Sequence, residues 1–255
     1  MRGAIQGAPH MISPDWPIII LSLEGDEGRR QALTDALMQA GLPFRIFYGV
    51  DGRRGLPAAY DPLIDREAAQ KRLRRRMTDA EFACALSHRA IYSLILDENL
   101  AGAVILEDDA IINPDFVEFI RSGLQRTGTM MLMDYNYGRA LPWQRKALGR
   151  WTLHRAAQRA TFTSSYSVSR SAAMTLLEAT TPVSYVADWP VNLYEMGAWL
   201  VSPKLAAQGG DPAQVSRIGA RPKASPRGRS RARIGFRWSD IGPYLRRRLS
   251  RPVGR

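Results

Sequence analysis

The sequence predicts an α/β fold in which a mostly parallel central sheet is flanked by helices. Residues 17–23 (Pro-Ile-Ile-Ile-Leu-Ser-Leu) form a continuous apolar run, the pattern of a strand that is buried on both faces. Residues 29–40 then place apolar side chains at helical spacing, Gly41 closes that helix, and residues 44–50 form a second apolar strand. A strand, a helix and a strand in this order predict a β-α-β unit, the building block of parallel sheets.

The composition indicates one large domain. The chain has 255 residues and is 45% hydrophobic, which is enough for one sizeable core. It contains no run of about 18 apolar residues, so no membrane-spanning helix is expected. Residues 1–14 lack the pattern of a secretory signal, and a single cysteine, Cys84, fits a reducing compartment. We therefore expect a cytoplasmic protein.

The net charge of +12 is concentrated at the C-terminus. Residues 217–255 contain 13 Lys or Arg and one acid, which leaves 23 basic and 23 acidic residues in 1–216. The sequence thus predicts a flexible N-terminus (1–15), an α/β domain (16–216) and a basic, partly disordered tail (217–255).

A long helix is predicted to begin after Thr78. Thr78 and Glu81 have the spacing of a capping box, and the helical pattern continues to about Asn99. Residues 53–76, which precede it, are rich in Pro, Gly and charge and end in a cluster of basic residues. They predict either a solvated helical excursion or a mobile segment whose arginines meet an anionic substrate.

Three consecutive acids, Glu107, Asp108 and Asp109, follow a buried strand at residues 103–106. Adjacent carboxylates repel one another, so this arrangement is costly unless a cation lies nearby. Mg²⁺ or Mn²⁺, bound by oxygen ligands and by phosphates of a substrate, is a natural counter-charge, and ligands of open α/β folds bind at the carboxyl ends of strands. The alternative is an acidic, solvated turn.

Further elements are expected downstream of the acids. They are a helix at 114–124, a strand at 130–134, an aromatic loop at 135–143, two paired strands at 151–154 and 161–168, a helix at 170–178 and a strand at 197–201. Aromatic loops of this kind stack on sugars or simply cover a core, and the pattern does not decide between the two.

Asp51 stands at the end of the second strand, where an acid often meets a ribose hydroxyl. The glycine fingerprint of dinucleotide folds is missing, which argues against a classical NAD site. His88 lies in the long helix that leads into the acidic strand. It is either a packed, hydrogen-bonded histidine or a residue directed at the site.

Three blocks resemble one family when they are taken together, because their order and spacing agree as well as their residue types. They are residues 18–52, with Ile18-Ile19-Ile20-Leu21-Ser22-Leu23 and Val50-Asp51-Gly52; residues 78–91, with Cys84-Ala85-Leu86-Ser87-His88; and residues 105–110, Ile-Leu-Glu-Asp-Asp-Ala. A weaker fourth element is Tyr166–Arg170 followed by Asp188. The chain thereby resembles the glycosyltransferases of family 25, the lipopolysaccharide-biosynthesis type related to collagen galactosyltransferases.

The resemblance implies a GT-A-like fold for residues 16–216, an inverting mechanism and a nucleotide-sugar donor, typically UDP-galactose or a relative. It also implies that Glu107-Asp108-Asp109 is the Asp-x-Asp-type motif that meets ribose and metal. Ser22 and Glu24 stand where the family usually has Asn and Asp, and Ala83 stands where Gly is usual. These departures leave the identity of the donor open.

The expected roles follow from this resemblance. Asp109 is predicted to bind Mn²⁺ or Mg²⁺ that bridges the donor's two phosphates, with Glu107 and Asp108 on ribose or on metal-bound water. The further donor-binding candidates are Arg29, Arg30, Asp51, Ser87 and His88. Arginine suits this task because its planar fork makes two bonds to one phosphate.

An inverting transfer needs a carboxylate that takes the proton of the acceptor hydroxyl. Asp188 is the first candidate for this base and Asp134 the second. The alternative role of Asp188 is a helix cap, and that of Asp134 is a turn at the end of a strand. The predicted reaction moves a hexose, galactose or a relative, from a UDP-sugar to lipopolysaccharide or another surface glycan. A glycoside hydrolase is a weaker alternative because it needs carboxylates on opposite sides of the bond.

The basic tail admits several partners. Aromatic and apolar residues among its arginines, such as Phe236, Trp238 and Tyr244, are typical of a segment that lies on an anionic membrane surface. Such a tail would place the protein at the inner membrane face, near lipid-linked acceptors. Nucleic-acid binding is less favoured because the rest of the chain is neutral, and a purely solubilising tail is the simplest alternative. An inactive binding or scaffold protein tethered by this tail is the alternative to an enzyme.

Overall fold

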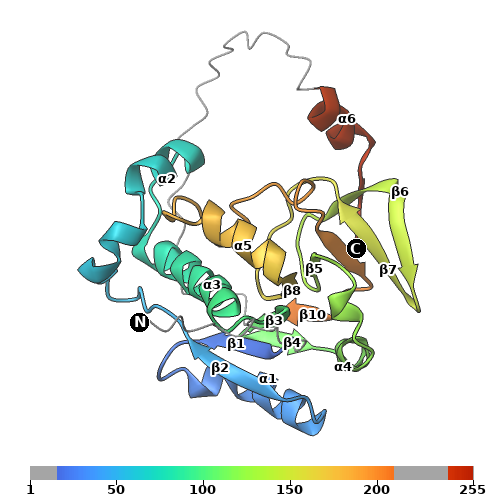
Figure 1. Ribbon diagram of the computed structural model, residues 1–255, viewed down its shortest axis with the longest axis horizontal. Helices are drawn as coiled ribbons and strands as arrows, with labels where there is room; N and C mark the ends of the chain where they lie inside the picture. The colour runs from blue at the N-terminus through green and yellow to red at the C-terminus, as the bar shows by residue number, and fades with distance from the viewer. Residues whose placement is uncertain (1–15, 210–240, 255) are drawn as a thin grey trace, which may run out of the picture.

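The computed structural model describes residues 16–209 and 241–254 and shows a large central sheet between helices (Figure 1). The sheet has nine strands in the order β11-β6-β7-β9-β5-β8-β3-β1-β2. Their bounds are β1 Ile18–Ser22, β2 Phe44–Tyr48, β3 Gly102–Glu107, β5 Met130–Leu132, β6 Arg139–Leu148, β7 Trp151–Ala156, β8 Ser165–Ser169, β9 Trp199–Ser202 and β11 Arg251–Pro252. A separate two-stranded sheet joins β4 (Ala110–Ile112) to β10 (Ala206–Gln208). The α/β prediction is confirmed.

Eight helical segments accompany these strands in the described part of the chain. They are α1 Glu27–Gln39, η1 Ala58–Leu63, α2 Arg66–Leu73, α3 Asp79–Asp97, α4 Pro114–Arg121, η2 Leu124–Arg126, α5 Arg170–Ala179 and α6 Ile241–Leu249. The segment between β2 and α3 is therefore a helical excursion, the first of its two predicted alternatives. Helix α1 ends as expected, with Gly41 at a φ of 59° just after its last turn.

Apolar cores cover both faces of the sheet. Alternate residues of β1 point in opposite directions, so Ile19 and Leu21 join one core while Ile18 and Ile20 join the other. The first core contains side chains of α3 and α5, and the second contains side chains of α1 and α4. The continuous apolar sequence of β1 thus reflects burial on both faces, as the sequence predicted.

Helix α3 begins with the predicted capping box. The Thr78 hydroxyl accepts a hydrogen bond from the backbone N–H of Glu81 (3.2 Å), and the Glu81 carboxylate accepts one from the N–H of Thr78 (2.9 Å). Arg75 also donates to the Glu81 carboxylate, which is buried. This end of the helix is therefore fixed, and with it the position of His88 two turns further on.

The sheet is parallel where it carries the predicted site and mixed elsewhere. Strand β1 pairs in parallel with both β2 and β3, so the ends of these three strands lie at one edge. Strands β5 and β9 are also parallel, whereas β8, β7, β6 and β11 form antiparallel pairs. The expectation of a mostly parallel sheet thus holds for the first part of the chain, where helical connections return the strand to the same direction.

Two local predictions in the second part are wrong. Residues 151–156 and 165–169 do not pair with each other: β7 pairs with β6 and β9, and β8 pairs with β3 and β5. The predicted aromatic loop also extends too far, since Arg139–Leu148 forms strand β6. The sequence does not predict this strand because the strand contains Pro142. This proline lies where the pairing register shifts between Ala140 and Arg145.

The end of the predicted tail is built onto the sheet. Strand β11 pairs with β6, the N–H of Val253 donates to Gly138, and Arg139 donates to the hydroxyl and carbonyl oxygens of Ser250. The last residues of the predicted tail therefore belong to the domain. They pair with β6, and Val253 packs against the core. The predictions for residues 1–15, for the Pro/Arg-rich stretch and for Phe236 and Trp238 lie outside the described residues.

Within residues 16–209 and 241–254, none of the helices is both long enough and apolar enough to span a bilayer.

We expect Thr78→Ala to lower the free energy of unfolding by about 1 kcal/mol, because it removes the side-chain half of the capping box. Urea unfolding followed by circular dichroism measures this loss. Thr175→Ala is the matched control, since Thr175 is exposed on α5 and caps no helix. Equal stability of the Thr78 and Thr175 variants would contradict the prediction.

Candidate functional site

A cavity of about 410 Å³ lies at the carboxyl ends of β1 and β3. This volume is in the range of small-molecule sites. Its walls are the end of β1, helix α1, the first turns of α3, the three consecutive acids at the end of β3 and the end of β10. Of the predicted site residues, Arg29, Ser87, Glu107, Asp108 and Asp109 line this cavity.

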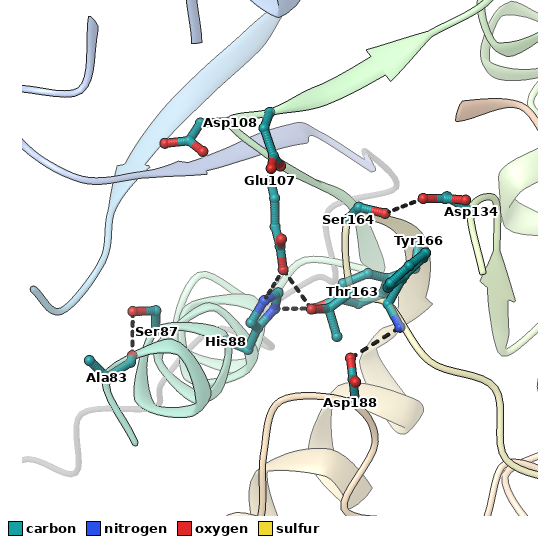
Figure 2. Close-up of polar contacts among 12 residues, drawn as sticks. Ala83, Ser87, His88, Glu107, Asp108, Asp134, Thr163, Ser164, Tyr166 and Asp188 are labelled. Carbon is teal, nitrogen blue, oxygen red and sulfur yellow. Dashed lines mark hydrogen bonds and ion pairs between the residues drawn. The ribbon is translucent and has the colours of Figure 1, made fainter. Parts of the chain in front are cut away.

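The three acids do not form one cluster. Figure 2 shows Glu107 directed toward α3 and Asp108 directed away from it. This is the alternation of a strand, since Ile105 belongs to the core on the α3 side and Leu106 to the core on the α1 side. Each acid consequently has its own partners.

Glu107 is held by two donors. Its Oε1 accepts hydrogen bonds from the ring Nε2 of His88 (3.1 Å) and from the hydroxyl of Thr163 (2.5 Å). The other ring nitrogen of His88 lies 2.9 Å from the hydroxyl of Tyr166, so the buried imidazole is fixed on both sides. Burial alone would raise the pKa of Glu107, but the hydrogen bonds and charges of His88, Thr163 and Arg29 lower it below its ordinary value. Glu107 is therefore an oriented, ionised carboxylate.

Arg29 joins the other two acids. Its Nε donates to Oδ1 of Asp108 (2.6 Å), and its terminal nitrogen donates to Oδ2 of Asp109 (2.7 Å). The hydroxyl of Ser22 donates to the remaining oxygen of Asp108 (2.9 Å). Burial opposes the charge of Arg29, but Asp109 and Asp108 raise the pKa of the guanidinium above its ordinary value. Ser22, one of the departures from the family pattern, thus takes part in the site.

Asp109 is the least satisfied of the three acids. Its Oδ1 is buried and has no hydrogen-bond partner among the described residues, although the Gln208 amide interacts with the same carboxyl group. Burial, together with the charges of Glu107 and Asp108, raises the pKa of Asp109 from 3.8 to about 6 in spite of Arg29. A half-buried acid with a buried, unused oxygen and two like charges nearby is a place where a further cation would be favoured.

Three predicted donor-binding residues surround the cavity in different ways. Ser87 lines it and also connects two elements, since its hydroxyl donates to Ala83 (2.7 Å) and accepts from the N–H of Val50 (2.8 Å). Arg30 is buried on α1, where it donates to Ser22 and Glu27. Asp51 is exposed at the rim and is bound by Arg53, which itself lines the cavity.

Sequence reasoning missed several residues of the cavity. Arg53 also makes an ion pair with the buried Asp26 (3.0 Å), which stands just before α1. Gln208 and Gly209 come from the far end of the described domain, where the N–H of Gly209 donates to the carbonyl of Asp109 (2.7 Å). Asp26 could have been proposed from its position just after the predicted first strand. No local sequence pattern predicts that Gln208, Gly209 or Thr163 belongs to the site.

The two candidate bases lie apart from each other. Asp134 is buried, accepts a hydrogen bond from Ser164 (2.7 Å) and lies 3.6 Å from the Lys204 ammonium. Asp188 accepts from the backbone N–H of Phe162 (3.0 Å) and lines a second cavity of about 360 Å³. Figure 2 shows Asp188 on the side of Thr163 that faces away from Asp134. Asp134 lines neither cavity.

Comparison with known proteins places this site in a family. The model of glycosyltransferase family 25, described as an LPS biosynthesis protein, matches residues 16–191. The chain belongs to glycosyltransferase family 25. The matched range begins just before β1 and contains Arg29, His88, the three acids and both candidate bases, so the resemblance inferred from the sequence blocks is confirmed.

Individual relatives match a shorter part of this family 25 chain. It is 27% identical over 103 residues to a putative glycosyltransferase of Haemophilus influenzae. It is 28% identical over 101 residues to a lacto-N-neotetraose biosynthesis glycosyltransferase of Neisseria meningitidis serogroup A. Each match covers 40% of this chain and 35% of the relative, so the chain spans about a third of these relatives.

A solved glycosyltransferase involved in glycosylation of the major capsid of PBCV-1 is also similar. It shares 11% sequence identity, covers 65% of each chain and has a TM-score of 0.33. A score this low has no bearing on the fold or the function. The α/β class rests on the sheet itself, and the glycosyltransferase assignment rests on the family.

The residues of this family 25 chain fit a divalent cation at Asp109. The unpartnered Oδ1 is a hard oxygen ligand beside two further carboxylates, and donor phosphates supply the rest of such a coordination shell in many enzymes. Glu107 is directed at His88 instead, and both oxygens of Asp108 are occupied by Ser22 and Arg29. Of the three predicted metal ligands, Asp109 is the one with a buried oxygen that has no hydrogen-bond partner among the described residues.

Cys84, His88 and Glu107 form a second group of side chains that could bind a metal ion. Ligand atoms of Cys84, His88 and Glu107 lie within 4.8 Å of one another. Burial, followed by the charges of Glu107 and Asp188, raises the pKa of the Cys84 thiol well above its ordinary value. Metal binding needs a thiolate, which this environment opposes, and His88 and Glu107 already bind each other.

The raised pKa of Asp109 predicts a pH-dependent stability. Between its ordinary pKa of 3.8 and the folded value of about 6, the folded state binds more protons than the unfolded state, so stability falls as pH rises. Asp109→Asn should gain on the order of 1 to 2 kcal/mol over wild type between pH 5 and pH 7.5. Urea unfolding in EDTA measures this difference. Asp97→Asn, an exposed acid on α3, is the control, and an equal response of both variants would contradict the assignment.

Proposed function

We propose that this chain transfers a hexose, galactose or a relative, from a UDP-sugar to a lipopolysaccharide-type glycan with inversion at the anomeric carbon. The observation that carries the proposal is the cavity at the ends of β1 and β3, where Asp109 has an unused oxygen next to Arg29. Family 25 membership supplies the reaction class, and the Neisseria meningitidis relative, named for lacto-N-neotetraose biosynthesis, supports a glycan as acceptor.

Binding of the donor is assigned to the cavity walls. Arg29 can turn from its acids to a phosphate, because its fork suits either kind of oxyanion. Asp109, with Asp108 beside it, would hold Mn²⁺ or Mg²⁺, and such a cation would neutralise the negative charge of a diphosphate leaving group. Ser87 and Arg53 also line the cavity and are assigned to the nucleoside, with Asp51 and Arg30 in support.

Two side chains orient Glu107 at the end of β3. His88 and Thr163 keep the Glu107 carboxylate ionised and fixed, and Glu107 lines the cavity from that side. A fixed carboxylate is suited to a ribose or sugar hydroxyl, since such a bond needs a preorganised acceptor. His88 therefore acts on the donor through Glu107 and does not itself line the cavity.

We expect UDP to bind in the presence of Mn²⁺, and Asp109→Ala to weaken binding strongly because it removes the proposed metal ligand. Isothermal titration calorimetry in Mn²⁺ and in EDTA measures both effects, with GDP and CMP as competing nucleotides. Asp97→Ala controls for the loss of a surface carboxylate. Failure of UDP to bind under every condition would end the transferase assignment and favour a scaffold protein.

Asp188 is proposed as the general base because it lines the second cavity and is oriented by Phe162. We expect Asp188→Asn to lower kcat by a factor on the order of 100 to 10,000 and to leave UDP binding unchanged. Asparagine keeps the Oδ1 that accepts from Phe162, so the fold should persist. The matched variant is Asp134→Asn. A larger loss of kcat in this second variant would make Asp134 the base instead.

Contact with an anionic membrane is proposed for helix α6. Arg246 faces the domain, where it stacks on Tyr194 (4.1 Å) and lies 3.5 Å from Glu195. Arg247, Arg248 and three large apolar side chains of the same helix are exposed instead. These are Tyr244, Leu245 and Leu249, with exposures of 56%, 44% and 44%. Apolar side chains among cations suit the interface of an anionic bilayer.

Replacing both Arg247 and Arg248 by Ala should weaken binding to anionic vesicles roughly 30-fold, at about 1 kcal/mol for each cation. Sedimentation with vesicles of phosphatidylglycerol and phosphatidylcholine measures this change. Arg121→Ala with Arg126→Ala removes the same charge away from α6 and should have a smaller effect. If the two double variants sediment alike, α6 is not the contact, and binding to pure phosphatidylcholine would contradict an electrostatic contribution.

A further inference from the structure

The second cavity brings together four segments that are distant in the sequence. Its lining includes Arg75 after α2, Tyr137 after β5, Arg159 and Thr161 before β8, and Asp188 before β9. Arg159 and Tyr137 are exposed, Tyr137 by 74%, whereas Asp188 and Arg75 are half-buried. The cavity is thus open to solvent and carries both charges and an aromatic ring.

Backbone strain is concentrated around this cavity. The non-glycine residues with positive φ in the described chain are Arg74 (56°), Asn99 (54°), Tyr137 (57°), Phe162 (80°) and Trp189 (59°). All of them except Asn99 either line the second cavity or are adjacent in sequence to a residue that does. Such backbone costs on the order of 1–3 kcal/mol per residue and is common at binding sites. At Phe162 it coincides with the hydrogen bond that orients Asp188.

The two cavities are close neighbours. Thr161 lines the second cavity, and two residues later Thr163 binds Glu107, which lines the first. On the other side, Arg75 holds Glu81 at the start of α3, and the next turns of this helix line the donor cavity with Ala83 and Cys84. The two cavities are therefore linked through Thr163 and Glu107 on one side and through the start of α3 on the other.

The exposed charge in the lining of the second cavity is Arg159, which donates to the backbone carbonyl of Asp188 (3.5 Å). The other two charged lining residues are Asp188 and Arg75, and Arg75 is bound to Glu81. Arg159 and Arg72 both stack on the Tyr185 ring, at 4.9 and 5.0 Å, so two cations share one aromatic neighbour. Arg74 and Arg76, at the end of the same excursion, are exposed. Arg72 does not line the cavity, whereas the exposed guanidinium of Arg159 does and is open to an anion from solvent. Phosphate and carboxylate are the anions that an arginine fork binds best.

We propose that this second cavity binds the acceptor and selects an anionic sugar, one that carries a phosphate or a carboxylate. The inference rests on the proposed transferase function. Arg159 binds the anionic group, Tyr137 stacks on the sugar ring, and Asp188 takes the proton of the accepting hydroxyl. The new bond joins the acceptor oxygen to the anomeric carbon, the bond from that carbon to the diphosphate breaks, and UDP leaves with the electron pair.

Glucose 6-phosphate, glucuronate and glucose are the probes for this site, titrated calorimetrically into the full chain with UDP and Mn²⁺ present. We expect the two anionic sugars to bind more tightly than glucose, and Arg159→Ala to weaken them by at least about tenfold. Arg159→Lys should restore part of the affinity. Arg126→Ala, which removes an exposed cation from η2, should change nothing.

Inorganic phosphate separates sugar binding from binding of any anion. Weaker binding of phosphate than of glucose 6-phosphate supports an acceptor site, and equal binding overturns it. Unchanged affinity for anionic sugars in Arg159→Ala also overturns the proposal, as does competition between glucose 6-phosphate and UDP. If UDP fails to bind but anionic sugars bind through Arg159, the transferase function fails while the anionic-sugar site stands.

Discussion

The structure depends on how one strand end distributes three negative charges. Because side chains of a strand alternate, Glu107 meets His88 on α3 and Asp108 meets Arg29 on α1, on opposite faces of the sheet. Both helices must therefore be placed accurately against β3, and their packing into the two cores provides this placement. Asp109 interacts with Arg29 and Gln208 but keeps one unused oxygen, and this imbalance makes the site receptive to a cation.

The fold could be predicted where local signals and tertiary structure agree. The apolar run of β1, the capping box of α3 and the glycine after α1 each act through neighbouring residues, so the sequence alone shows them. Strand β6 contains a proline at an irregular pairing, and β11 is two residues long and follows a basic segment. Each of these strands is stabilised by pairing with the strand beside it, and no local sequence pattern predicts which strand that is.

The site could be predicted in composition but not in geometry. Glu107, Asp108, Asp109, Arg29 and Ser87 were identified from the strand end and from the family blocks, and all of them line one cavity. Their pairing could not be foreseen, because it depends on which face of the sheet each helix covers. Thr163 comes from the segment before β8 and Gln208 from the end of β10, and both were missed for the same reason. The second cavity combines four segments that only the tertiary structure brings together.

The central claim is that Asp109, and not the group formed by Cys84, His88 and Glu107, receives the metal beside the donor. Anomalous diffraction at the manganese edge, from crystals grown with UDP and Mn²⁺, tests it most directly. The account predicts a manganese peak within coordination distance of Asp109, with UDP next to Arg29 and Glu107 still bound to His88. A peak at Cys84 and His88, or UDP in the second cavity, would contradict it.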